Sequence, residues 1–145
     1  YEHQGAFARV KSNDGYWGII DINGNMIFDG ADSIEKLPST MSLGAAVKDG
    51  HAVIFKIETG EKVEIVKSLE KYKDISEIYY ECFAIVKNDK ESYGVIDSNG
   101  NEIIPVEYTN IDFDVLYSEN WYGSHVVFKL KKDDGYDIME INFND

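Results

Sequence analysis

Cysteine and arginine are scarce in this 145-residue chain, and each scarcity excludes a class of protein. Cys82 is the only cysteine, so an intramolecular disulfide framework is excluded. Arg9 is the only arginine, and 27 acidic residues against 14 Lys and Arg give a formal net charge of -13. Such a chain repels a polyanion at ordinary salt, because a phosphate-binding surface needs clustered cations. We therefore expect no binding to nucleic acid.

Long apolar runs are also lacking. One of the longest covers residues 52–55, far short of the roughly 20 residues that a membrane-spanning helix needs. No charged-then-apolar leader precedes Gly5, but the chain begins with Tyr1 and not with Met, which leaves open the removal of a signal or of further repeats. We expect a cytoplasmic protein without a membrane span. Its 43% hydrophobic residues suffice for the core of one domain over residues 1–145.

The excess of acidic residues has two explanations. The first is solubility, because added Asp and Glu keep a protein in solution. The second is electrostatic steering toward a basic partner, which speeds association at low salt. The composition favours the first explanation, and the second stays open.

The sequence repeats itself. The segment YWGIIDINGN at residues 16–25 returns as YGVIDSNGN at residues 93–101. A segment ending in an apolar residue and a lysine precedes each match and also recurs elsewhere, ending at Lys11, Lys48, Lys87 and, in drifted form, Lys129. A period of a few tens of residues is typical of supersecondary units that stack on their neighbours. We expect four units, at approximately residues 1–31, 32–70, 71–108 and 109–145.

Each unit is predicted to be a small antiparallel meander. Apolar, β-branched and aromatic residues alternate with polar ones, and Asp14-Gly15 and Asn23-Gly24 are typical of tight turns. A third strand is expected at residues 26–28, 62–66 and 102–104, the last ended by Pro105. We therefore predict an all-β fold of four repeated meander units, forming a propeller-like partial ring or a short β-solenoid. A short helix within residues 68–80 is the minor alternative.

The links between units are patterned as well. Each places an isoleucine after polar residues, at Ile34, Ile75 and Ile111. We expect these side chains to fill the junctions between units. Two further pairs have structural explanations: Gly18 and Gly94 would permit a close backbone approach or a bulge, and Asp21 and Asp97 would accept N–H groups of the following turn.

Taken together, these residues resemble the WG repeat, also called the KWG repeat, of bacterial proteins. Unit three carries the pattern best, through residues 83–87, 93–97, Gly100, 103–105 and Tyr108. Unit one matches through Gly5, Ala8, residues 10–11, residues 17–21 and Gly24. Units two and four depart from it, since both lack the Trp-Gly pair and unit four lacks the turn glycine. The resemblance implies an all-β interaction module and brings no catalytic residues with it.

None of the residue groups in the sequence is a specific sign of a catalytic or metal-binding site. The turns at residues 21–25 and 97–101 fail the EF-hand pattern at its sixth and twelfth positions. The histidines lack metal-ligand spacing, acidic pairs arise by chance in so acidic a chain, and the S-x-x-K matches lack their companion motifs. Cys82 lies beside Glu81, which disfavours a reactive thiolate. We expect no catalytic residue, cofactor or metal.

One segment, residues 112–123, stands apart because it interrupts the link between units three and four with mixed aromatic and acidic residues. We expect it to form an inserted loop, and aromatic anchors beside charges are typical of binding hot spots. The predicted partner-binding residues are Phe113, Asp114, Tyr117, Glu119, Trp121 and Tyr122. Equally open is a capping role, in which Phe113, Leu116 and Trp121 close the end of the array.

The function predicted from these observations is a non-enzymatic protein–protein interaction module. The first alternative is an acidic immunity or inhibitor protein that neutralises a basic toxin or nuclease. The second is a glycan-binding or glycoside-acting protein that uses aromatic platforms and a carboxylate pair. The partner is another protein, with basic character under the first alternative, and the sequence leaves the oligomeric state open.

Overall fold

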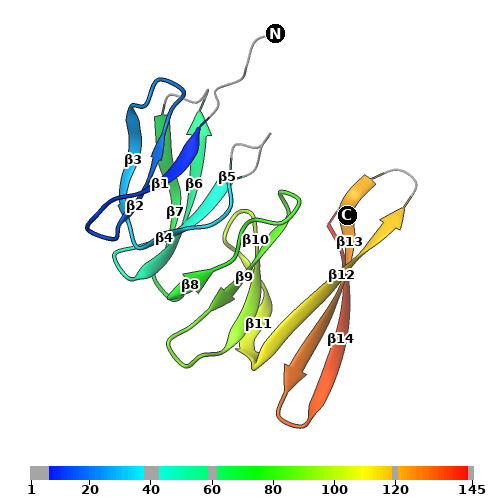
Figure 1. Ribbon diagram of the computed structural model, residues 1–145. Coiled ribbons are helices and arrows are strands. Elements are labelled where there is room, and N and C mark those ends of the chain that lie inside the picture. The colour runs from blue at the N-terminus through cyan, green and yellow to red at the C-terminus, as the bar shows by residue number, and fades with distance from the viewer. Residues whose placement is uncertain (1–6, 38–42, 59–61, 119–120, 144–145) are drawn as a thin grey trace. The chain divides into compact units, whose positions relative to one another are not determined.

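A computed structural model describes residues 7–37, 43–58, 62–118 and 121–143, without the side chains of residues 58, 117, 118 and 121–124 (Figure 1). These residues form strands β1–β14 and no helix, and every strand pairing given by register is antiparallel. The all-β prediction is confirmed, and the alternative of a helix within residues 68–80 is wrong. None of the described residues belongs to a helix that could cross a membrane.

The chain divides into two compact units, Tyr1–Glu77 and Ile78–Asp145. The first contains a three-stranded sheet in the order β1-β2-β3 and a four-stranded sheet in the order β4-β5-β6-β7. Its strands are β1 (Ala8–Lys11), β2 (Trp17–Ile20), β3 (Met26–Ala31), β4 (Ser33–Ile34), β5 (Leu43–Lys48), β6 (His51–Glu58), β7 (Lys62–Leu69) and β8 (Asp74–Ile75). The short β8 lies against β5 and β6.

The second unit contains a meander in the order β11-β10-β9 and a three-stranded sheet in the order β12-β13-β14. Its strands are β9 (Phe83–Lys87), β10 (Tyr93–Asp97), β11 (Glu102–Tyr108), β12 (Asn110–Ser118), β13 (Trp121–Lys132) and β14 (Gly135–Asn142). Four antiparallel sheets are therefore present, as the four predicted meanders require. Their arrangement as a ring or a solenoid stays a prediction.

Each compact unit has its own apolar core. In the first, the rings of Phe28 and Phe55 stack with their centroids 5.4 Å apart. In the second, Phe83 is fully buried and lies edge-on to Phe128 at 5.1 Å. The three linking isoleucines are all buried, and two belong to these cores: Ile34 to the first and Ile111 to the second.

The glycines of the repeated motif lie where the backbone of the next strand, β3 for Gly18 and β11 for Gly94, approaches closely. A Cβ on Gly18 would lie 2.6 Å from the carbonyl oxygen of Phe28, and one on Gly94 would lie 2.7 Å from that of Ile104. In both meanders the register of the second and third strands shifts at this point. The predicted close approach and bulge are confirmed, because only a residue without Cβ leaves room for the bulged carbonyl.

The prediction that Pro105 ends its strand is wrong, since β11 continues to Tyr108. Within its meander β11 pairs only with β10, and the register shift lies between the pairs Val95↔Ile104 and Tyr93↔Tyr108. Proline is tolerated at bulges and on edge strands because no ladder hydrogen bond needs its missing N–H.

The turn aspartates have the predicted role. The Oδ1 atom of Asp21 accepts the backbone N–H groups of Asn23 and Asn25, both at 2.9 Å. Asp97 accepts those of Asn99 and Asn101 at the same distances. The N–H donors lower the pKa of Asp21, the Asn25 N–H most strongly. Carboxylates at these positions therefore organise the turn.

The lysine that closes the recurrent first strand lies beside the motif aromatic. Lys11 is the ladder partner of Trp17, and its Nζ is 5.8 Å from the ring centroid. Lys87 pairs with Tyr93 in the same way, at 5.5 Å. The spacing of lysine and aromatic in the sequence thus reflects a cross-strand cation–π contact.

Candidate partner-binding surface

The expected inserted loop is wrong for the described part of residues 112–123. Residues 112–118 lie in β12 and residues from Trp121 onward lie in β13, joined as a long antiparallel hairpin (Figure 1). The sequence alternates here, with Ile111, Phe113 and Val115 separated by Asp112 and Asp114. Such a period of two is typical of a strand with one buried face.

The predicted contact residues separate along this hairpin. Phe113 is half-buried, whereas Asp114 is exposed. Tyr117, Trp121 and Tyr122 lie within strands, but their side chains are outside the described residues, as is all of Glu119. Their proposed contact role stays a prediction.

Phe113 faces the core of its own unit. Its ring centroid is 4.7 Å from that of Tyr79 and 5.1 Å from that of Phe83. A third ring, Phe128, lies opposite on β13 at 6.3 Å. Aromatic pairs at these separations are favourable beyond the area they bury. The Phe113 ring therefore holds the β12–β13 hairpin against the core of its unit.

The opposite side of the β12–β13–β14 sheet forms what we call the outer face. Ladder partners place its side chains in rows, one of which joins Asp114, Val127 and Glu140. Another joins Asp112, Lys129 and Ile138. The apolar side chains most exposed on this face are Leu116 at 41%, Tyr136 at 55% and Ile138 at 65%. Apolar and acidic side chains thus share one exposed surface.

Several cations near this surface already have partners. The Lys129 Nζ is 4.1 Å from the centroid of the Tyr136 ring, and His125 pairs with Glu140. Lys132 lies 3.2 Å from Glu107, whose hydrogen bond raises the lysine pKa. Asp112 and Asp114 are exposed on the same face. The outer face also exposes Lys131, the ladder partner of Tyr136, so it carries charges of both signs beside its apolar side chains.

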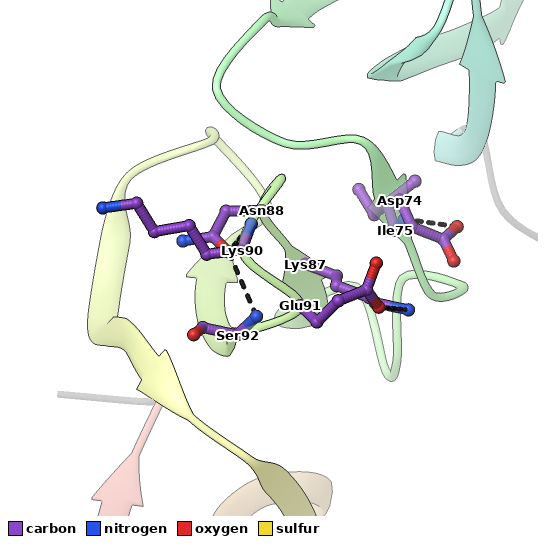
Figure 2. A network of polar contacts seen from close by, with 7 residues as sticks. All are labelled: Asp74, Ile75, Lys87, Asn88, Lys90, Glu91 and Ser92. Carbon is purple, nitrogen blue, oxygen red and sulfur yellow. Dashed lines mark hydrogen bonds and ion pairs between the residues drawn. The ribbon is translucent and has the colours of Figure 1, made fainter.

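Other polar clusters have structural roles. In Figure 2 the side chain of Asn88 accepts the N–H groups of Lys90 and Ser92, both at 3.0 Å, and so closes the β9–β10 turn. Beside it Lys87 and Glu91 form an ion pair at 2.6 Å, which raises the pKa of Lys87. This network uses its donors and acceptors internally.

A carboxylate-rich group lies in the first unit. Partial burial raises the pKa of Glu35, the charges of Asp74 and Glu77 raise it further, and Arg9 lowers it. The Arg9 guanidinium also donates to the Ile34 carbonyl at 2.7 Å. Among the described residues, no group of three or more His, Cys, Asp or Glu is arranged to hold a metal ion.

The thiol of Cys82 is in an environment that disfavours its ionisation. Burial raises its pKa, and the charge of Glu81 raises it further. The Sγ donates to the carbonyl of Tyr80 at 3.1 Å. A thiolate nucleophile needs a cation or a depressed pKa, and these contacts supply neither.

Sequence reasoning missed the exposed apolar residues of β14. Tyr136, Ile138 and Met139 were interpreted only as a degenerate fourth unit, yet all three are exposed. The signal was available, because residues 135–142 combine four large apolar side chains with two acidic ones and contain neither lysine nor proline. The hydrogen bonds of the links also change which lysine of the fourth unit corresponds to Lys48: it is Lys132 and not Lys129. The N–H of Asp32 binds the carbonyl of Val47, the residue before Lys48, and the N–H of Thr109 binds the carbonyl of Lys131, the residue before Lys132.

Comparisons of the chain with protein-family models, with curated proteins and with solved structures found no match. The resemblance to the WG repeat therefore rests on the residues quoted above.

Proposed function

We propose that this protein is a non-enzymatic protein–protein interaction module whose partner binds the outer face of the β12–β13–β14 sheet. The observation that carries the proposal is the exposure of Leu116, Tyr136 and Ile138 on the same face as Asp112 and Asp114. Tyr136 and Ile138 occupy adjacent rows of this face, whereas Leu116 lies two rows beyond Ile138, with Asp114 and Glu140 between them. A strand face in water normally carries polar side chains, so we take these exposed apolar side chains as the mark of an interaction surface.

The strand pairing and core packing beneath this surface support the proposal. β12 and β13 pair through an extended register, and the rings of Phe113 and Phe128 hold the other side of the sheet to the core. A surface that is already ordered loses little conformational entropy on binding. The predicted contacts Trp121 and Tyr122 lie at the start of β13, on the same hairpin.

Affinity capture from a native lysate of the source organism tests the proposal. The wild-type chain is compared with Leu116→Lys and with a double substitution of Trp121 and Tyr122 by alanine. The matched control is Ile65→Lys, because Ile65 on β7 has the same 41% exposure as Leu116. We expect Leu116→Lys and the double variant to lose a protein that the wild type and the control retain. Equal capture by all four chains would contradict the proposal.

A neutralising inhibitor is the second candidate, favoured by the exposed acids and the net charge of -13. Oppositely charged surfaces accelerate association at low ionic strength. The captured partner should then be basic, and its association rate should fall steeply as salt is added. A partner whose association rate is insensitive to salt would leave the apolar contact as the dominant interaction.

A further inference from the structure

β14 is an edge strand that lacks several of the usual protections against pairing. It runs for eight residues, pairs with β13 in one uninterrupted register, and contains neither lysine nor proline. All of its residues except Ile141 are exposed. In an antiparallel ladder every second residue of an edge strand directs its N–H and C=O groups outward. A regular row of such groups is a template for another strand.

Most of the other outer strands of the four sheets carry a protecting feature. β4 has two residues, and β1 has four. Register shifts interrupt the pairing of β3, β7 and β11, and that of β12 only after Leu116, near its end. β11 also contains Pro105, and β7 contains Lys62 and Lys67. Short length, bulges, proline and charged side chains all discourage edge pairing. Of these, β14 has only charges, Asp137 and Glu140, and carboxylates oppose an acidic neighbouring strand but not a cationic one.

The charge around β14 indicates what pairs with it. The strand and its preceding turn expose four carboxylates, at Asp133, Asp134, Asp137 and Glu140, and β14 itself carries no cation. The nearest lysines, Lys129, Lys131 and Lys132, belong to β13, on the side of β14 away from its open edge. A second copy of the chain would bring the same carboxylates and a further net charge of -13 to the contact. Like charges placed together on neighbouring strands are destabilising, whereas opposite charges stabilise the pair. The occupant should therefore be cationic.

We propose that β14 accepts an extended cationic segment of a partner protein, which adds to the sheet as a fourth strand. Backbone hydrogen bonds supply the pairing, apolar side chains of the segment lie beside Tyr136 and Ile138, and lysine or arginine lies beside Asp137. This mode of strand addition is one by which proteins recognise extended peptides. The inference rests on the proposed function and names the partner's chemistry and its mode of binding.

The direct test uses a synthetic peptide of the length of β14 in which valine and lysine alternate. Its binding to the full chain is measured at low ionic strength, with amide hydrogen exchange read residue by residue. We expect saturable binding and slowed exchange in β14. A peptide with glutamate in place of lysine, and one N-methylated at alternate amides, should both fail to bind. Equal binding of the N-methylated peptide, or slowed exchange confined to other strands, would overturn strand addition.

Two variants with the same charge change sharpen the test. Asp137→Lys reverses a charge on β14, and Glu64→Lys does the same on the exposed face of β7. We expect Asp137→Lys to lower the affinity for the valine–lysine peptide by about tenfold and Glu64→Lys to leave it unchanged. No binding by the wild-type chain, or equal loss in both variants, would refute the proposal. A wild-type dimer in sedimentation experiments that is disrupted by Asp137→Lys would identify a second copy as the occupant and would also refute it.

The outcome is separable from that of the proposed function. Asp137 lies on the side of β14 opposite to the outer face, because its ladder partner is the buried Leu130. A captured partner that is lost with Leu116→Lys but kept with Asp137→Lys would preserve the interaction module and refute strand addition. Loss with Asp137→Lys alone would support strand addition and place the contact at the edge instead of the outer face.

Discussion

Replacing Gly18 with alanine should destabilise the first unit through a single methyl group. The added Cβ would lie 2.6 Å from the Phe28 carbonyl oxygen and 2.7 Å from the Met26 sulfur. The methionine side chain can move, but the carbonyl belongs to the bulged backbone of β3 and cannot move without disturbing the ladder. Forcing a methyl group into a filled space typically costs about 1–3 kcal/mol. We therefore expect Gly18→Ala to lower the free energy of unfolding by about 2 kcal/mol.

The measurement is urea denaturation followed by circular dichroism, with unfolding midpoints compared at unchanged slope. The control is Gly135→Ala, because a Cβ at Gly135 meets no atom within 4 Å and this residue has no positive φ. The control should remain within about 0.5 kcal/mol of the wild type. If Gly18→Ala were as stable as the control, the close approach would not explain the motif glycine.

Two further predictions concern stability. Phe113→Ala should lower the free energy of unfolding by about 2 kcal/mol, less than for a fully buried ring, and denaturant melts compared with the exposed control Leu116→Ala would show it. Because the pKa of Glu35 is raised on folding, the folded protein holds that proton more tightly, and stability falls as pH rises from the unfolded value of 4.5 through the folded one. Glu35→Gln should therefore gain in melting temperature over the wild type between pH 4 and pH 7, and a constant difference would contradict this sign.

Local structure could be predicted well where short-range chemistry decides it. Asn-Gly after a strand indicated the turns that Asp21 and Asp97 close, and a glycine inside a strand indicated the bulge opposite Gly18. The strands themselves followed from alternation of apolar and polar residues. These features depend on neighbours within a few residues, or on one adjacent strand.

The features that could not be predicted depend on strand register and on which strands lie at the edge of a sheet. Pro105 was expected to end its strand because proline cannot donate a ladder hydrogen bond. The sequence does not show that β11 has a bulge at this point, where the missing N–H is tolerated. Residues 112–123 were expected to form a loop because they mix aromatic and acidic residues. Residues 111–115 nevertheless alternate apolar and acidic side chains, as a strand does. The position of β14 at the end of its sheet, with no strand on its outer side, is shown only by the complete set of strand pairings.

The cross-strand lysine and aromatic pairs affect how such repeats are recognised. Lys11 and Trp17 are separated in the string of letters but adjacent in the ladder, as are Lys87 and Tyr93. Each contact needs both members of its pair, so a copy that loses the aromatic residue no longer needs the lysine for this contact. Diverged copies should then be sought by covariation between paired columns of an alignment, which can retain a signal after the Trp-Gly letters themselves are gone.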